Sequence, residues 1–242
     1  MKKNLKNPKS EPSQKLLCGV LSKREAVATI GGGCRHVHST ALGTRDPAAK
    51  QTSDALAGQK VATYAWEPST AVQPMLLGNS IDRAAVIQKV IVEGGIEKKR
   101  FLREKVSCVL EELITNALYH AYRNSAGSEK YARRKDVTLA SQEVIEIRYQ
   151  VTANGIYLSV SDKAGSLTFD DVARSLWRCY ETSTQIESKE SGAGLGTYMV
   201  FDAVTHLKFE TKPGAYTIVS CWIADQRSYD PEAFSFNYFE RR

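Results

Sequence analysis

Residues 96–122 read IEKKRFLREKVSCVLEELITNALYHAY and contain the longest regular spacing of apolar residues in the chain. From Phe101 to Ala121 an apolar residue recurs about every three or four positions, which is the period of an α-helix with one face in a core. Glu112 and Asn116 are one helical turn apart and therefore share one face. The stretch predicts a long helix that carries a carboxylate and a carboxamide side by side.

These two side chains allow two interpretations. Burying a polar group is costly unless it finds a partner, so they either face solvent or line a site. In a site, the amide oxygen could bind a hard cation together with phosphate oxygens. The carboxylate could hold or activate a water or a hydroxyl.

The segments on both sides of this helix predict a sheet and further helices. Towards the N-terminus we expect a strand over Val61–Trp66 and a helix from Ser80, its N-cap, to Glu93. Towards the C-terminus, alternating side chains around an Asn-Gly turn predict a hairpin. The expected strands there are 144–151, 156–161, 207–211 and 216–224, and the expected helices are 168–180 and 197–207. The sum is an α+β fold, a two-layer α/β sandwich with a mixed, mostly antiparallel sheet and helices on one face.

Two further motifs follow the long helix. Asp162 comes directly after an expected strand, so its carboxylate could accept a hydrogen bond from an exocyclic amine, and Gly165 would let the backbone pass close to a flat ring. Residues 191–196, SGAGLG, lead into a helix, where glycines leave successive N–H groups open to a phosphate. Alone, each motif is also explained by an ordinary turn. The glycine run fits neither the Rossmann nor the P-loop pattern.

In this order and spacing, the three motifs resemble the ATP-binding domain shared by gyrase, the heat-shock chaperone ATPases, histidine kinases and the MutL proteins. The resemblance covers roughly Ile81–Ala224, and the expected fold is therefore of the Bergerat type. The segment with Glu112, Asn116-Ala117 and His120-Ala121 is most similar to that of the anti-sigma-factor serine kinases.

The resemblance implies a role for each matching position. Asn116 would coordinate a Mg²⁺ that bridges the phosphates of ATP, and Glu112 would be the general base. Asp162 would bind the adenine amino group, with Gly165 against the base and Thr217 as a looser match in support. The phosphates would be held by Gly192, Gly194, Leu195 and Gly196.

The chain also departs from the family pattern. The first glycine box usually reads Asp-x-Gly-x-Gly, and here Ala164 and Ser166 stand at two of the three small positions. No phosphoacceptor helix pair precedes the domain, which argues against a complete sensor histidine kinase. The altered glycine box leaves adenine binding open.

The segments outside the motifs differ in composition. Residues 1–60 carry 11 basic and 4 acidic side chains, whereas the other 182 residues carry 22 basic and 23 acidic ones. We therefore divide the chain into a basic, low-complexity tail over 1–60, expected to be disordered, an ATP-binding domain over 61–224 and a packed aromatic extension over 225–242. A short helix around Leu16–Ala28 is an option within the tail. Without a basic excess in the folded part, nucleic-acid binding is not expected.

The composition also bears on location and partners. The five cysteines form no CxxC pair, and no apolar run is long enough to span a membrane, so reduced thiols in a cytoplasmic protein are expected. The expected ligands are ATP and Mg²⁺, and the expected partner is a regulatory protein, such as an anti-sigma antagonist or a sigma-like factor. Homodimer formation stays open.

Three functions remain in competition at this point. The first is a serine protein kinase that transfers phosphate from Mg²⁺-ATP to a small protein partner, which the pair Glu112 and Asn116 favours. The second is a non-catalytic module in which the nucleotide switches a partner-binding surface, which the altered glycine box favours. The third is a scaffold without a ligand.

Overall fold

The strands of the chain form a single mixed sheet. The computed structural model describes residues 16–40, 45–58, 72, 74–132, 135–181, 196–225 and 233–242. Within them the strand order is β1-β2-β8-β6-β7-β5-β4-β3. The strands are β1 (Leu16–Gly19), β2 (His36–Ser39), β3 (Met75–Leu77), β4 (Ile145–Thr152), β5 (Gly155–Asp162), β6 (His206–Lys212), β7 (Tyr216–Ala224) and β8 (Phe234–Glu240). Because β1–β2 and β6–β8 are parallel and the other neighbouring pairs antiparallel, the mixed, mostly antiparallel sheet is confirmed.

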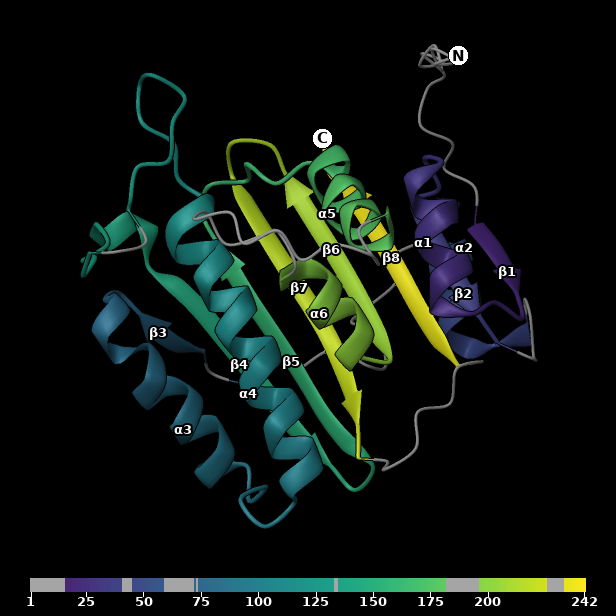
Figure 1. Ribbon diagram of the computed structural model, residues 1–242, viewed down its shortest axis with the longest axis horizontal. Coiled ribbons are helices and arrows are strands. Elements are labelled where there is room, and N and C mark those ends of the chain that lie inside the picture. Colours follow the sequence, from purple (N-terminus) through teal and green to yellow (C-terminus); the bar gives the residue numbers. More distant parts are fainter. Residues whose placement is uncertain are drawn as a thin grey trace.

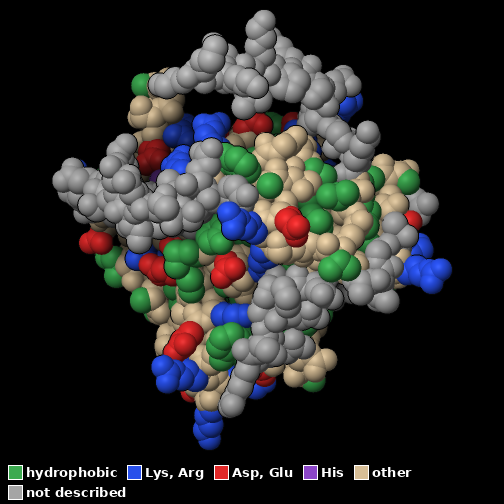
Figure 2. Space-filling model, turned by 45° about the vertical axis from the view of Figure 1, so that its right-hand side comes forward, with side chains coloured by type: hydrophobic (Ala, Val, Ile, Leu, Met, Phe, Trp, Pro, Cys, Tyr) green, Lys and Arg blue, Asp and Glu red, His purple; other side chains and the backbone are tan. Residues whose placement is uncertain are grey.

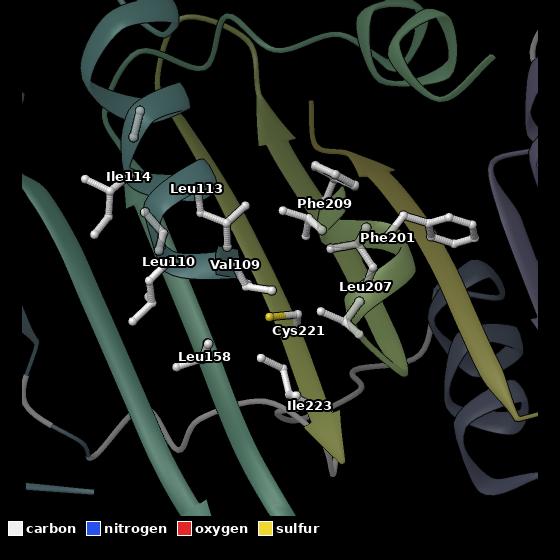
Figure 3. Close-up of a cluster of buried hydrophobic side chains, with 14 of the residues drawn as sticks. Val109, Leu110, Leu113, Ile114, Leu158, Phe201, Leu207, Phe209, Cys221 and Ile223 are labelled. Carbon is white, nitrogen blue, oxygen red and sulfur yellow. The ribbon is translucent and has the colours of Figure 1, made fainter. Parts of the chain in front are cut away.

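Most of the helices cover one face of this sheet (Figure 1). The helices are α1 (Lys23–Gly31), α2 (Pro47–Leu56), α3 (Arg83–Glu93), α4 (Arg100–Thr115), α5 (Phe169–Glu181) and α6 (Gly196–Ala203). The apolar stripe of α4 packs onto the centre of the sheet, where Leu110 and Ile114 lie over Leu158 and Cys221 (Figure 3). This packing fixes the rotation of α4 about its own axis, and with it the direction of Glu112 and Asn116.

The expectation of helices on one face only is wrong for α2. Its residue Ala48 packs with Phe239 of β8, and Thr52 lies within hydrogen-bond distance of His38 and Asn237. The neighbours of these strand residues, Val37 and Phe236, belong to the main core, so side-chain alternation places α2 on the opposite face.

The expectation of a disordered tail is wrong for 16–40 and 45–58. The strands β1 and β2 extend the sheet, α1 buries Ala26, Val27 and Ile30 in the main core, and Ser22 caps α1 through a reciprocal bond with Glu25. The predicted helix over Leu16–Ala28 is replaced by a strand and then a helix. Short elements of this kind are stabilised by tertiary partners more than by their own sequence.

The C-terminal segment is also part of the sheet. Strand β8 lies between β2 and β6, and its residues Phe234–Phe239 are buried. One sheet thus contains strands from all three segments into which the sequence divided the chain.

Apart from β3, which the sequence did not predict, the remaining helices and strands follow the predicted order, with shifted boundaries. The predicted cap Ser80 instead lies in a 3-10 turn, Ser80–Asp82, whose own cap is Asn79, and the Ser80 hydroxyl accepts a bond from the Val137 N–H. The predicted strand Val61–Trp66 lies outside the described residues. Among the described residues, no helix combines the length and the apolar character needed to cross a bilayer.

Candidate functional site

A pocket of about 520 Å³ lies between the helical layer and the sheet. It is lined by side chains from α4 and the turn that follows it, from β5, β6 and β7, and from α5 and α6. Of the sequence-predicted site residues, it contains Glu112, Asn116, Asp162, Gly196 and Thr217. A volume of this size is in the range of small-molecule sites.

The helical side of the pocket is formed by α4 and a π-helical turn, Asn116–His120, that directly continues it. Glu112 and Asn116 are both half-buried and line the pocket. The N–H of Asn116 donates to the carbonyls of Glu112 and Leu113, so the backbone bonding of α4 runs without a break into this turn. Single π-turns inside α-helices are frequent at functional sites.

One turn beyond Asn116, the His120 ring also lines the pocket. Its Nδ1 atom lies 2.5 Å from Oε1 of Glu129. This contact fixes the orientation of the ring beside the pocket. In the sequence, His120 belongs to the motif on the long helix, and nothing there indicates its role.

The sheet side of the pocket is centred on Asp162 at the end of β5. Its Oδ1 atom accepts hydrogen bonds from the N–H groups of Ala164 and Gly165, at 2.9 and 3.3 Å. Burial is the main cause that raises the pKa of Asp162, while these N–H donors and the nearby Thr217 oppose the rise. A buried carboxylate with one oxygen held by the backbone can accept a bond from a ligand on the other.

Thr217 stands opposite Asp162 in the register of β5 and β7. Its side chain is 3% exposed, and among the described residues its Oγ1 atom has no hydrogen-bond partner of good geometry, although it is near enough to help hold down the pKa of Asp162. A buried hydroxyl without a partner at the wall of a cavity indicates that a water or a ligand group completes its bonding.

Gly165 does not line the pocket, contrary to the expected contact with a base. It has a φ of +59°, and a Cβ there would lie 2.1 Å from the Lys212 carbonyl oxygen. Its own carbonyl accepts a hydrogen bond from the Gly214 N–H. A glycine is therefore needed so that this loop can approach the turn between β6 and β7.

Of the glycine run, the structure places Gly196 alone. This residue begins α6, and a Cβ there would lie 2.0 Å from Oε2 of Glu112. The absence of a side chain thus lets the Glu112 carboxylate reach the start of α6. Gly192, Gly194 and Leu195 lie outside the described residues.

Two residues that sequence reasoning did not assign join the two sides of the pocket. The Ser166 hydroxyl donates to the Ala121 carbonyl at 2.6 Å, and Ser166 also lines the pocket. The Tyr122 hydroxyl accepts from the Lys163 N–H and donates to the Glu143 carbonyl, both at 3.1 Å. Ser166 occupies a position where the family pattern has glycine, so this departure now has a structural explanation.

One lining residue of the pocket, Asn116, could contribute to a cation site. Among the described residues, no group of three or more His, Cys, Asp and Glu side chains could hold a metal ion by itself. Asn116 supplies one amide oxygen to the pocket, and Mg²⁺ characteristically combines one or two protein ligands with phosphate oxygens and waters. A cation bound here would therefore need further ligands besides Asn116.

The charges around the site are mixed. Arg123, Asp171 and Arg178 are exposed and line the pocket beside Glu112 and Asp162. On the face shown in Figure 2, the basic and acidic side chains of the described residues are interspersed.

No protein-family model matches the chain. No curated protein matches it significantly either.

Proposed function

We propose that this protein binds Mg²⁺-ATP and acts as a serine protein kinase or anti-sigma-like factor on a small regulatory protein, in a Bergerat-type fold. One observation carries the proposal. Five residues that the resemblance assigns to a nucleotide site converge on one pocket, although they come from segments up to about a hundred positions apart in the sequence. If the motifs matched by chance, these five residues would not be expected to line the same pocket.

The base end of the site is formed by Asp162 and Thr217. The free oxygen of Asp162 would accept the exocyclic amine of adenine, and the Thr217 hydroxyl would bond to the neighbouring ring nitrogen directly or through a water. Both groups are buried and preorganised by the pairing of β5 with β7. They favour a base with an amine donor beside a ring acceptor.

The phosphate end is formed by Asn116, Glu112 and the start of α6. Bound Mg²⁺ would neutralise charge on the phosphates, with the Asn116 amide oxygen as its protein ligand. Glu112 would accept the proton of the attacking serine hydroxyl as that oxygen bonds to the γ-phosphorus and the bond to ADP breaks. Gly196 would keep the helix N-terminus open to the phosphates.

A second function is favoured by one contact. The Glu112 carboxylate lies against the start of α6, so that a Cβ at Gly196 would clash with it. If this contact persists with nucleotide bound, Glu112 is held away from an acceptor hydroxyl. The protein would then be a non-catalytic module whose partner-binding surface is switched by the nucleotide. Either way a sigma-like partner would place the protein in the cytoplasm.

Calorimetric titration with ATP, with and without Mg²⁺, tests nucleotide binding. We expect Asp162→Asn to weaken binding by about a hundredfold, since it presents an amide where the ligand needs an acceptor. Asn116→Ala should remove the dependence on Mg²⁺. Asp170→Asn is the matched control, because Asp170 is exposed on α5 and lies outside the pocket. Equal affinity in Asp162→Asn and Asp170→Asn would refute the site.

Turnover of ATP to ADP separates the two functions. Glu112→Gln should abolish turnover and leave binding within about twofold, since only the base is lost. Glu111→Gln is its control, because the neighbouring Glu111 points away to Arg83, 3.0 Å from its carboxylate. Binding without turnover, and without transfer of phosphate to any partner protein, would select the non-catalytic module.

A further inference from the structure

Helix α1, in the segment expected to be a disordered tail, contacts both helices that form the outer wall of the pocket. These two helices, α5 and α6, supply a shared group of lining residues: Asp171, Val172, Ser175, Arg178, Gly196, Thr197, Met199 and Val200. The packing of α1 against α5 is the most extensive contact between helices in the described residues. The position of this wall therefore depends on what α1 holds in place.

On α6, the contact is made by Lys23 in the first turn of α1. Its ammonium group donates to the carbonyls of Phe201, Asp202 and Val204, at 2.5, 2.7 and 2.8 Å. The last carbonyls of a helix have no partner within the helix, and the helix dipole favours a cation there. Lys23 thus completes the C-terminal end of α6 from a different part of the chain.

The same lysine is held by its surroundings. Its ammonium lies 5.1 Å from the centre of the Phe201 ring and 6.0 Å from that of Phe234. Burial is the main cause that lowers the pKa of Lys23 to about 7, while the nearby Asp202 opposes this change. The three hydrogen bonds and the two ring contacts offset the cost of taking this amine out of water.

On α5, the contact is made at the other end of α1. A Cβ at Gly31 would lie 2.8 Å from Cε3 of Trp177, so the indole ring rests directly on the glycine backbone. Trp177 is half-buried and packs against the main core. The Trp177 ring therefore packs in a space that exists because residue 31 has no side chain. Any larger residue there would push α5 outwards.

We propose that α1 positions the helical wall of the pocket, with Lys23 holding the end of α6 and Gly31 seating Trp177 of α5. Lys23 and Gly31 act as positioning residues, since neither lines the pocket. The segment 16–40 then contributes to the site, because it controls the position of α5 and α6 and thereby the affinity of the pocket for a ligand. That the ligand is a nucleotide rests on the proposed function, whereas the control of the wall by α1 does not.

Hydrogen exchange of the backbone amides tests this control without any ligand. In Lys23→Met, we expect the amides of α6 to exchange about tenfold faster, because the helix loses its C-terminal partner while the apolar stem is kept. Arg24→Met is the matched control, since it removes the same charge from the exposed neighbouring position of the same helix. Titration with Mg²⁺-ATP should show about tenfold weaker binding in Lys23→Met and none of this loss in Arg24→Met.

A second pair of variants tests the α5 contact. Gly31→Ala should speed exchange in α5 and change the fluorescence of Trp177. Gly19→Ala should do neither, because a Cβ at Gly19 meets nothing within 4 Å. If Lys23→Met fails to fold, the comparison of Gly31→Ala with Gly19→Ala still tests whether α1 positions the helical wall.

The outcomes separate the two proposals. Faster exchange confined to α1 itself, or spread evenly to the hairpin of β4 and β5, would overturn the positioning role. Faster exchange in α5 and α6 of a protein that binds no ATP would keep the role and refute the proposed nucleotide function.

Discussion

Two clusters of buried polar side chains lie on opposite faces of the same sheet. The open cluster, Asp162 and Thr217, borders the pocket under the helical layer. The sealed cluster consists of His36, His38, Thr52 and Asn237, under α2. In the sealed cluster the groups face one another, with the Asn237 Oδ1 atom within 3.3 Å of a polar atom of each of the other three side chains.

The difference shows which feature identifies a site. Both clusters contain buried polar atoms that lack a hydrogen-bond partner among the described residues, namely Thr217 Oγ1 in one and His38 Nδ1 and Asn237 Nδ2 in the other. An unsatisfied atom is therefore not sufficient evidence of a ligand. The open cluster differs because it faces a cavity of about 520 Å³, in which a ligand can supply the missing bonds.

The largest effect is expected in the loop that holds the open cluster. Gly165→Ala should lower the free energy of unfolding by about 4 kcal/mol, because it combines a strained φ with a clash. Gly214→Ala also has a positive φ but meets nothing within 4 Å, so about 1 kcal/mol is expected there. Urea denaturation of both variants measures the difference. Similar losses would show that the approach to the turn between β6 and β7 is unimportant.

A comparable loss of stability is expected in the sealed cluster. Asn237→Ala removes the shared acceptor and should lower the free energy of unfolding by about 3 kcal/mol. The affinity for Mg²⁺-ATP should stay within about twofold, since the cluster lies on the other face of the sheet. A loss of affinity as large as in Asp162→Asn would abolish the distinction between the clusters.

The sealed cluster should also make the fold sensitive to acid. Burial is the main cause that lowers the pKa of His36 from 6.5 to about 4. The unfolded chain therefore binds a proton at a pH where the folded chain does not, and stability present above pH 6.5 is lost as the pH falls towards 4. The loss should be about 3 kcal/mol. Denaturation curves between pH 7 and 4 should show a shallower decline in His36→Gln, and identical curves would contradict this origin.

The smallest effect on stability is expected at Thr217. Thr217→Val removes a hydroxyl that has no hydrogen-bond partner of good geometry among the described residues, so stability should change by less than about 1 kcal/mol, while Mg²⁺-ATP binding weakens about fivefold. Thr211→Val is the matched control, because its buried hydroxyl lies 2.9 Å from the Tyr238 hydroxyl. That variant should lose stability and keep its affinity. The reverse pattern would place the ligand elsewhere.

Much of the pocket could be predicted because its residues lie on elements with strong local patterns. The apolar period of α4 fixes which face of the helix is buried, and Glu112 and Asn116 follow from it. Asp162 is marked by its place after an alternating strand. The approach of Gly165 to the turn between β6 and β7 was not predicted, because a sequence shows that a backbone is permissive, and not which group approaches it.

The flanking segments could not be predicted for a different reason. Strand β2 has the sequence HVHS, which offers a single apolar side chain, and β1 is equally short. Strand β2 is stabilised by hydrogen bonds to β8, which lies at the other end of the sequence, and β1 is in turn stabilised by pairing with β2. Likewise, nothing local indicates that Lys23 meets the end of α6.

The place of β8 in the sheet has a consequence for how this protein is made. His36 and Asn237 pair across 201 residues, so β2 has no neighbour on its inner side until β8 has been synthesised. At ordinary translation speeds the ribosome needs on the order of ten seconds or more to cover that distance. During this interval the growing polypeptide exposes the inner edge of β2, a condition in which chaperones commonly protect nascent chains.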